Sequence, residues 1–463
     1  MRNRRNRLSA DLRLAWLLTR GSDRREWWRV TLTAVGAGGA TGIGLAVATL
    51  AAVDGQYSVS FGAGLLNQPS DRRGVIAVLL MLLVPVLGFL GQCARVGAVH
   101  RDRRLAALRL AGAAPAQVRR IAALEAGLAC LAGSAVATVF CVLILLRVWQ
   151  APEPMAWLGI ALVAVTVPVL GAAVSTLSLR RVVASPLGRV RRVRPTRGPG
   201  RVFGLVTGLL TLLVVCAAVV IAATPYRANR LGFTVVPFTV CTVTLLIAAA
   251  SLWLAGSSSR RLGEAFAARA QRPALLIAAA RLRDDPWAAA RTHAGVLVVT
   301  VVGAGFVGVR EVLLADLRAM RRDGRLGMNM EYYTNGLGLT GAAILLALVL
   351  VLSALAVGTA ESLATRRRGL AAQAAAGVPS AVLRRALLLE TALPLAPAVA
   401  VAGLGGMTIS AWYASVTSEH TVPDVPYLAL VVPLAVYAAC LLAAATSLPL
   451  LRRSVRPAEL RYV

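Results

Sequence analysis

Long runs of uncharged, mostly apolar residues alternate with short arginine-rich segments along the whole chain. Nine runs contain about 21 or more residues, enough for a helix to cross the hydrocarbon core of a bilayer. They cover residues 31–53, 74–94, 126–146, 154–179, 202–226, 231–259, 332–360, 391–418 and 425–451. A tenth run, 294–309, is shorter, and His293 and Arg310 can complete it at the membrane edges. The pattern predicts an all-α integral membrane protein with about ten transmembrane helices.

The short seventh span is followed by a segment with the periodicity of a helix. Apolar side chains in residues 310–325 recur on one helix face, at Val312, Leu313, Leu317 and Met320. We therefore expect this span to continue beyond the membrane as an amphipathic helix. The two longest outer loops, 54–73 and 310–331, are too short to hold a large external domain.

A short basic segment lies between the second and third spans and recurs near the C-terminus. In the first copy, residues 101–126, Gly112 is expected to end one helix and Pro115 to begin the next. At a fixed offset of 265 positions, Arg103, Ala106, Ala107, Gly112, Arg119, Arg120 and Glu125 match Arg368, Ala371, Ala372, Gly377, Arg384, Arg385 and Glu390. The shared order of residue types predicts an internal duplication.

The duplication divides the chain into two units of four spans, residues 1–187 and 260–463. Residues 188–259, an arginine-rich linker and two extra spans, separate them. The order of basic residues, leucines, glycine, Arg-Arg and glutamate resembles the core of the FtsX-like (MacB-type) ABC transporter permeases. The segments 183–187 and 456–461 are similar to the family's ending. The arrangement of four, two and four spans is similar to the permeases of its antimicrobial-peptide resistance branch.

The resemblance implies a permease subunit that displaces an amphiphile, such as a lipid, a peptide antibiotic or a drug. A separate cytoplasmic ATPase, as a dimer, would bind ATP and Mg. The two basic segments would be coupling helices, with Leu105 and Leu108 in a groove of the ATPase and arginines at its rim; Leu370 would belong to a weaker second contact. The full set of implied coupling residues is Arg103, Arg104, Leu105, Leu108, Arg109, Gly112, Arg119, Glu125, Arg368, Leu370, Gly377, Arg384 and Glu390.

Composition supports a membrane protein over a soluble basic one. Hydrophobic residues make up 58% of the chain, and the mean hydropathy is +0.71, which is too apolar for one soluble core. The net charge of +30 comes from arginine alone, because the chain has no lysine. The arginines concentrate on the side that holds both termini, so the positive-inside rule places the termini in the cytoplasm of a plasma-membrane protein. Contact with anionic lipid headgroups explains this excess of arginine, so we expect no nucleic-acid partner.

Residues that carry chemistry are sparse. Without lysine there is no phosphate-binding Gly-Lys-Ser/Thr loop, so we expect no ATP hydrolysis and no cofactor in this chain. The six cysteines lie in apolar runs and predict buried free thiols, and the three histidines are too scattered to predict a metal site. Glu125 and Glu390 begin the third and ninth spans. They complement the helix start, pair with Arg119 and Arg384, or take part in force transfer, and the sequence leaves these alternatives open.

Glycines gather in the first span of each unit. They allow either a substrate path near the outer leaflet or close packing of helices, and we favour packing. The candidate path residues are Gly36, Gly38, Gly303, Gly305 and Gly308. Two other functions stay open from the sequence: a secondary transporter built from repeats, and a membrane sensor that signals to a histidine kinase.

Overall fold

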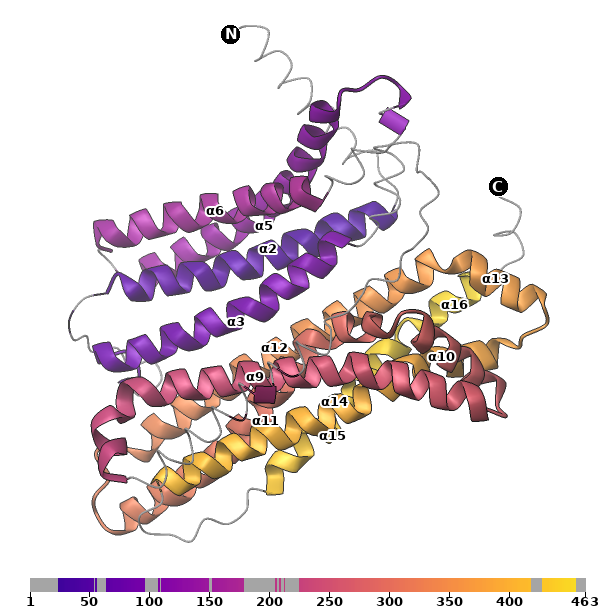
Figure 1. Cartoon of the computed structure of the whole chain (residues 1–463). Coiled ribbons are helices and arrows are strands. Elements are labelled where there is room, and N and C mark those ends of the chain that lie inside the picture. Colours follow the sequence, from indigo (N-terminus) through magenta and orange to yellow (C-terminus); the bar gives the residue numbers. More distant parts are fainter. Residues whose placement is uncertain are drawn as a thin grey trace, which may run out of the picture. The chain divides into compact units, whose positions relative to one another are not determined.

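The protein is helical throughout the part of the chain that the structure describes. A computed structural model describes residues 24–53, 55, 64–95, 107–108, 110–149, 152–178, 205, 208–209, 212, 225–417 and 427–454. Within these ranges it contains no strand. Contacts between residues divide the chain into two compact units, Met1–Arg192 and Val193–Val463 (Figure 1).

The expected membrane-spanning character is confirmed. In the described ranges, nine helices are long and apolar enough to cross a membrane, and each overlaps a predicted span. They are Val30–Ala51, Asp71–Leu90, Ala116–Val148, Pro154–Ala173, Thr242–Arg269, Thr292–Arg322, Met330–Thr365, Ser380–Ser415 and Tyr427–Leu451. The other predicted span, 202–226, lies almost entirely outside the described residues.

The first unit is built around its first helix. Its elements are α2 (Arg24–Ala51), α3 (Pro69–Arg95), α5 (Pro115–Val148) and α6 (Pro154–Ser178), and α2 packs against the other three. Small residues make this packing close. A Cβ atom at Gly133 of α5 would lie only 1.9 Å from the carbonyl oxygen of Ala34, so only glycine fits at this crossing.

The second unit repeats this arrangement. Its main helices are α11 (Pro286–Arg322), α12 (Met330–Thr365), α14 (Ser380–Thr417) and α15 (Val431–Ala445), which follows the short 3-10 helix η2 (Tyr427–Leu430). Here α11 packs against α12, α14 and α15, as α2 packs against its three neighbours. The shared pattern of contacts supports the predicted duplication. The predicted helical continuation of the seventh span beyond residue 309 is confirmed, because α11 is one helix from Pro286 to Arg322.

The segment before α11 differs from the sequence-based division. Helix α9 (Pro225–Arg269) contains the extra span 231–259 and continues past it, and it packs against α11 and α14 inside the second unit. Gly256 of α9 lies against the ring of Trp287. Helix α10 (Pro273–Asp284) then packs against the end of α9, where Gly263 lies close to the Ala279 carbonyl. The extra span is therefore part of the second unit, because its side chains complete the packing of α11 and α14.

Candidate coupling site

The second basic segment forms a short helix between two long ones. α12 ends at Thr365, α13 (Arg367–Ala375) follows after the single residue Arg366, and α14 begins at Ser380. Gly377 ends α13 with φ +87°, a conformation that other residues rarely adopt. The Val378 amide donates to the Gln373 carbonyl at 3.1 Å, which closes the helix end as a Schellman motif.

The first copy closes in the same way at the 265-residue offset. Gly112 has φ +95°, and the Ala113 amide donates to the Leu108 carbonyl at 3.0 Å. Pro115 begins α5, so the predicted break at Gly112 and restart at Pro115 are confirmed. Four of the predicted coupling residues of this copy, Arg103, Arg104, Leu105 and Arg109, lie outside the described residues.

Leu370 is corrected from a partner contact to a core residue. Its side chain is 0% exposed and packs in a buried cluster with Leu363, Leu383 and Leu451. The apolar face of α13 is thus used inside the unit, because burying it against α12, α14 and α16 (Leu448–Ser454) removes it from water. Leu108 behaves similarly in the first copy, where it is half-buried against Val118 and Ala122.

The opposite face of the α13 segment is exposed and basic. Arg368, Ala372 and Gly377 are exposed on and after α13, and Arg384 and Arg385 are exposed on the first turns of α14. We call these five residues the arginine face. In the first copy the matching residues Arg119 and Arg120 are also exposed. Another molecule can therefore reach the α13 segment only from the side of its charged and small residues, because the leucine side is buried within the unit.

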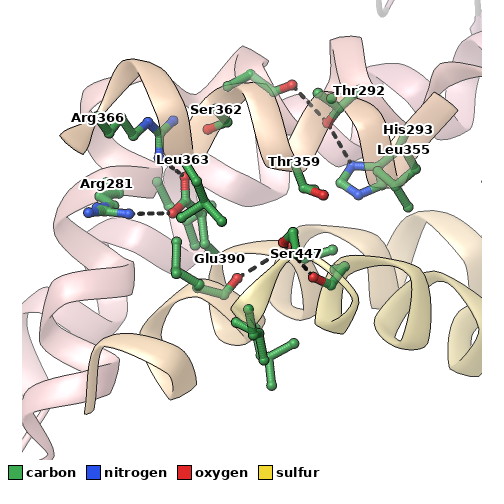
Figure 2. A pocket seen from close by; sticks show the side chains of 18 of the residues that line it. Arg281, Thr292, His293, Leu355, Thr359, Ser362, Leu363, Arg366, Glu390 and Ser447 are labelled. Carbon is green, nitrogen blue, oxygen red and sulfur yellow. Dashed lines mark hydrogen bonds and ion pairs between the residues drawn. The ribbon is translucent and has the colours of Figure 1, made fainter. Parts of the chain in front are cut away.

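Glu390 pairs with two arginines beside the start of α13 (Figure 2). Its Oε1 accepts a hydrogen bond from Nη1 of Arg366 at 2.6 Å, and its Oε2 accepts one from Nη1 of Arg281 at 3.0 Å. Glu390 therefore pairs with Arg366 and Arg281, and the predicted pairing with Arg384 is wrong. Residues six apart point to different sides of a helix, and Arg384 is exposed. Glu125, its counterpart, is only 4% exposed.

A cavity of about 110 Å³ adjoins the Glu390 carboxylate. Hydroxyl groups and one imidazole line it together with the ion pairs, and Figure 2 shows these side chains around it. The polar lining includes Thr292, His293, Thr359, Ser362 and Ser447. His293 is 3% exposed, with its Nδ1 3.3 Å from the Thr292 hydroxyl. In the described ranges, no cluster of three or more His, Cys, Asp or Glu side chains could hold a metal ion. The site holds charged side chains in place beside a polar cavity.

The partners of Glu390 were not identified from the sequence. Arg366 did carry a signal, because it matches Arg101 at the same offset of 265 that relates Glu390 to Glu125. Arg281 carried none, since it is 109 positions away and belongs to no repeated pattern.

The glycine rows pack helices within each unit. A Cβ atom at Gly36 would meet Leu90 at 3.2 Å, and one at Gly38 would meet the Gly133 carbonyl at 3.2 Å. In the second unit, Gly303 faces Val432, Gly305 faces Gly406, and Gly308 is buried. These contacts support the packing interpretation. Among the described residues, Cys93, Cys130 and Cys440 are buried free thiols, as expected, whereas the free thiol of Cys141 is only partly buried.

Compared with models of known protein families and with curated proteins, the sequence matches none.

Proposed function

We propose that this protein is the membrane subunit of an ABC transporter of the FtsX-like type. It works with a separate cytoplasmic ATPase dimer, which binds ATP and Mg, and it displaces an amphiphilic substrate from the membrane. The observation that carries the proposal is the duplicated helix–glycine–helix break, one copy in each four-helix unit, with the same hydrogen bonds at both.

The packing of α13 suits it to pass movement to the spans. Leu370 joins α13 to Leu363 of α12, Leu383 of α14 and Leu451 of α16 in one buried cluster. Packed cores resist compression, so a push on α13 displaces the ends of these helices together. A helix bound only by its backbone would transmit less of this movement to the spans.

The arginine face suits a partner with an acidic surface. Arg368, Arg384 and Arg385 would direct its approach and register, because exposed charges act mainly on association and orientation. Ala372 and Gly377 leave room for close contact beside them. With Leu370 in the core, this second contact depends on charge and fit instead of a leucine anchor.

The substrate class rests on the resemblance and on the spans themselves. Large apolar side chains such as Leu158, Leu162 and Leu345 are exposed along the helices, as expected where they face lipid tails. The ion-paired Glu390 and the buried Glu125 occupy matching positions, each ten residues after the first residue of its helix, Ser380 in α14 and Pro115 in α5. A hydrophobic substrate taken from the membrane fits this distribution better than an ion carried through its centre.

Purification of the full chain from its own membranes in mild detergent tests the proposal. An ATP-hydrolysing protein should copurify with the chain. The double variant Arg368→Glu/Arg385→Glu should retain clearly less of it, because the new charges repel an acidic surface. Arg321→Glu is the matched control and should retain the wild-type amount. Arg321 is exposed in the last turn of α11, at the end of that helix away from α10.

Three results would contradict the proposal. A histidine kinase recovered without an ATPase would favour the sensor. Gradient-driven transport by the purified chain alone would favour the secondary transporter. Equal loss of the ATPase in the control variant would remove the arginine face from the interface.

A further inference from the structure

A single carboxylate joins three separate elements at the base of α13. Glu390 belongs to α14, Arg281 to α10, and Arg366 is the one residue between α12 and α13. The side chains of Arg281 and Glu390 are 19% and 21% exposed, and that of Arg366 is 37% exposed. The ion pairs are therefore shielded from water more than ordinary surface pairs, without being sealed in the core.

Arg366 is also the junction between α12 and α13, which we call the hinge. Its backbone closes α12 by donating to the Ser362 carbonyl, and its own carbonyl accepts from the Leu370 amide, so it lies in both helix ends. Its φ of −97° and ψ of 9° depart from helical values, which sets the change of direction at this residue. Holding the Arg366 side chain on Glu390 therefore also holds the angle between α12 and α13.

The cavity beside the carboxylate lets this contact open. Arg281, Arg366 and Glu390 all line it, and its volume of about 110 Å³ is enough to admit water molecules. Separated charges there can be hydrated, which reduces the penalty of breaking a shielded pair. Leu370 stays in its buried cluster meanwhile, so opening changes the angle of α13 without detaching it.

We propose that Glu390 is a latch that holds the α12–α13 hinge closed through Arg366, with Arg281 keeping the carboxylate in position. Release of the latch lets α13 change its angle to α12. The meaning of that movement for transport rests on the proposed function, whereas the latch itself is a property of this chain alone.

Distance measurements between spin labels test the latch without any partner. Labels replace the exposed residues Ala280 on α10 and Ala372 on α13, in a cysteine-free full-length chain in lipid nanodiscs. Glu390→Gln should raise about tenfold the population of molecules in which the distance between the two labels has changed. Tenfold lies between the effect expected for the loss of an exposed charge pair and that for the loss of a buried one. Arg366→Gln should do the same, and the double variant should add little, because both changes break one contact.

The matched control is Glu264→Gln on α9. This carboxylate also pairs with an arginine, Arg260 at 3.1 Å, but the pair is 71% and 53% exposed and spans no hinge. It should leave the distance unchanged. Three outcomes would overturn the latch: unchanged distances in folded Glu390→Gln and Arg366→Gln, an equal change in the control, or loss of folding in both variants, which would make the pair structural. Loss of the ATPase in copurification would instead bear on the proposed function.

Discussion

Replacing Gly406 by alanine should force α11 and α14 apart. A Cβ atom at Gly406 would lie 2.6 Å from the Ala304 Cβ, 2.7 Å from the Val301 carbonyl oxygen and 2.8 Å from the Gly305 nitrogen. Two of these atoms belong to the backbone, so rotating a side chain cannot relieve the overlap. Ordinary contact begins at 3.4 Å, so the helices must separate by about 0.6 to 0.8 Å.

Two opposing effects set the size of the change. Overpacking costs about 1 to 3 kcal/mol, and a clash with two backbone atoms belongs in the upper part of that range, about 2 to 3 kcal/mol. The higher helix propensity of alanine returns about 1 kcal/mol. We therefore expect Gly406→Ala to lower the free energy of unfolding by about 1 to 2 kcal/mol. Gly305 provides the matched control, because its Cβ would meet the Gly406 oxygen at an ordinary 3.5 Å. Gly305→Ala should be neutral or slightly stabilising.

Thermal unfolding of the purified variants in one detergent gives the comparison. The midpoint of Gly406→Ala should fall by about 1 to 2 °C, while that of Gly305→Ala should stay at or above the wild-type value. A Gly406→Ala protein as stable as the wild type would refute the close crossing of the two helices. An equal fall of the midpoint in both variants would also refute it, because the crossing has room for a methyl group at Gly305 and none at Gly406.

Three further predictions concern the break and the topology. Gly377→Ala should lower the free energy of unfolding by about 1 kcal/mol through its positive φ, whereas Gly369→Ala inside α13 should raise it slightly; thermal midpoints of both variants check the sign. Leu370→Ala should cost about 2 to 5 kcal/mol by leaving a cavity, and a near-neutral midpoint would contradict its core position. Cysteines placed at Arg325 and Arg283 should react from opposite sides of the membrane, with only the first accessible to an impermeant reagent in intact cells; equal labelling would overturn the predicted orientation.

Features set by local sequence were predictable. Run length and composition predicted the spans, because a helix that faces lipid must be apolar over a fixed length. The break at Gly112 and Gly377 followed from the same logic, since glycine is the residue that tolerates the left-handed end of a helix. The continuous α11 followed from apolar spacing beyond the seventh run.

Features set by tertiary packing were not predictable in the same way. Leu370 lies on an amphipathic face, and periodicity shows that such a face is buried without showing against what. Proximity in sequence favours Arg384 as a partner of Glu390, whereas the observed partner Arg281 arrives from α10 through the folding of a distant segment. The place of α9 against α11 and α14 depends on the shapes of three helices at once.

The length of α11 gives the second unit a stiff arm. At 1.5 Å per residue its 37 residues extend about 55 Å, against about 42 Å for the 28 residues of α2. The hydrocarbon core is about 30 Å thick, so much of α11 stands outside it. No proline interrupts the arm, so a tilt of about 5° at its α10 end would sweep the tip near Arg322 through about 5 Å. A displacement at the α10 end of α11 that is too small to rearrange the packing near Glu390 would thus become several times larger at the other end of α11.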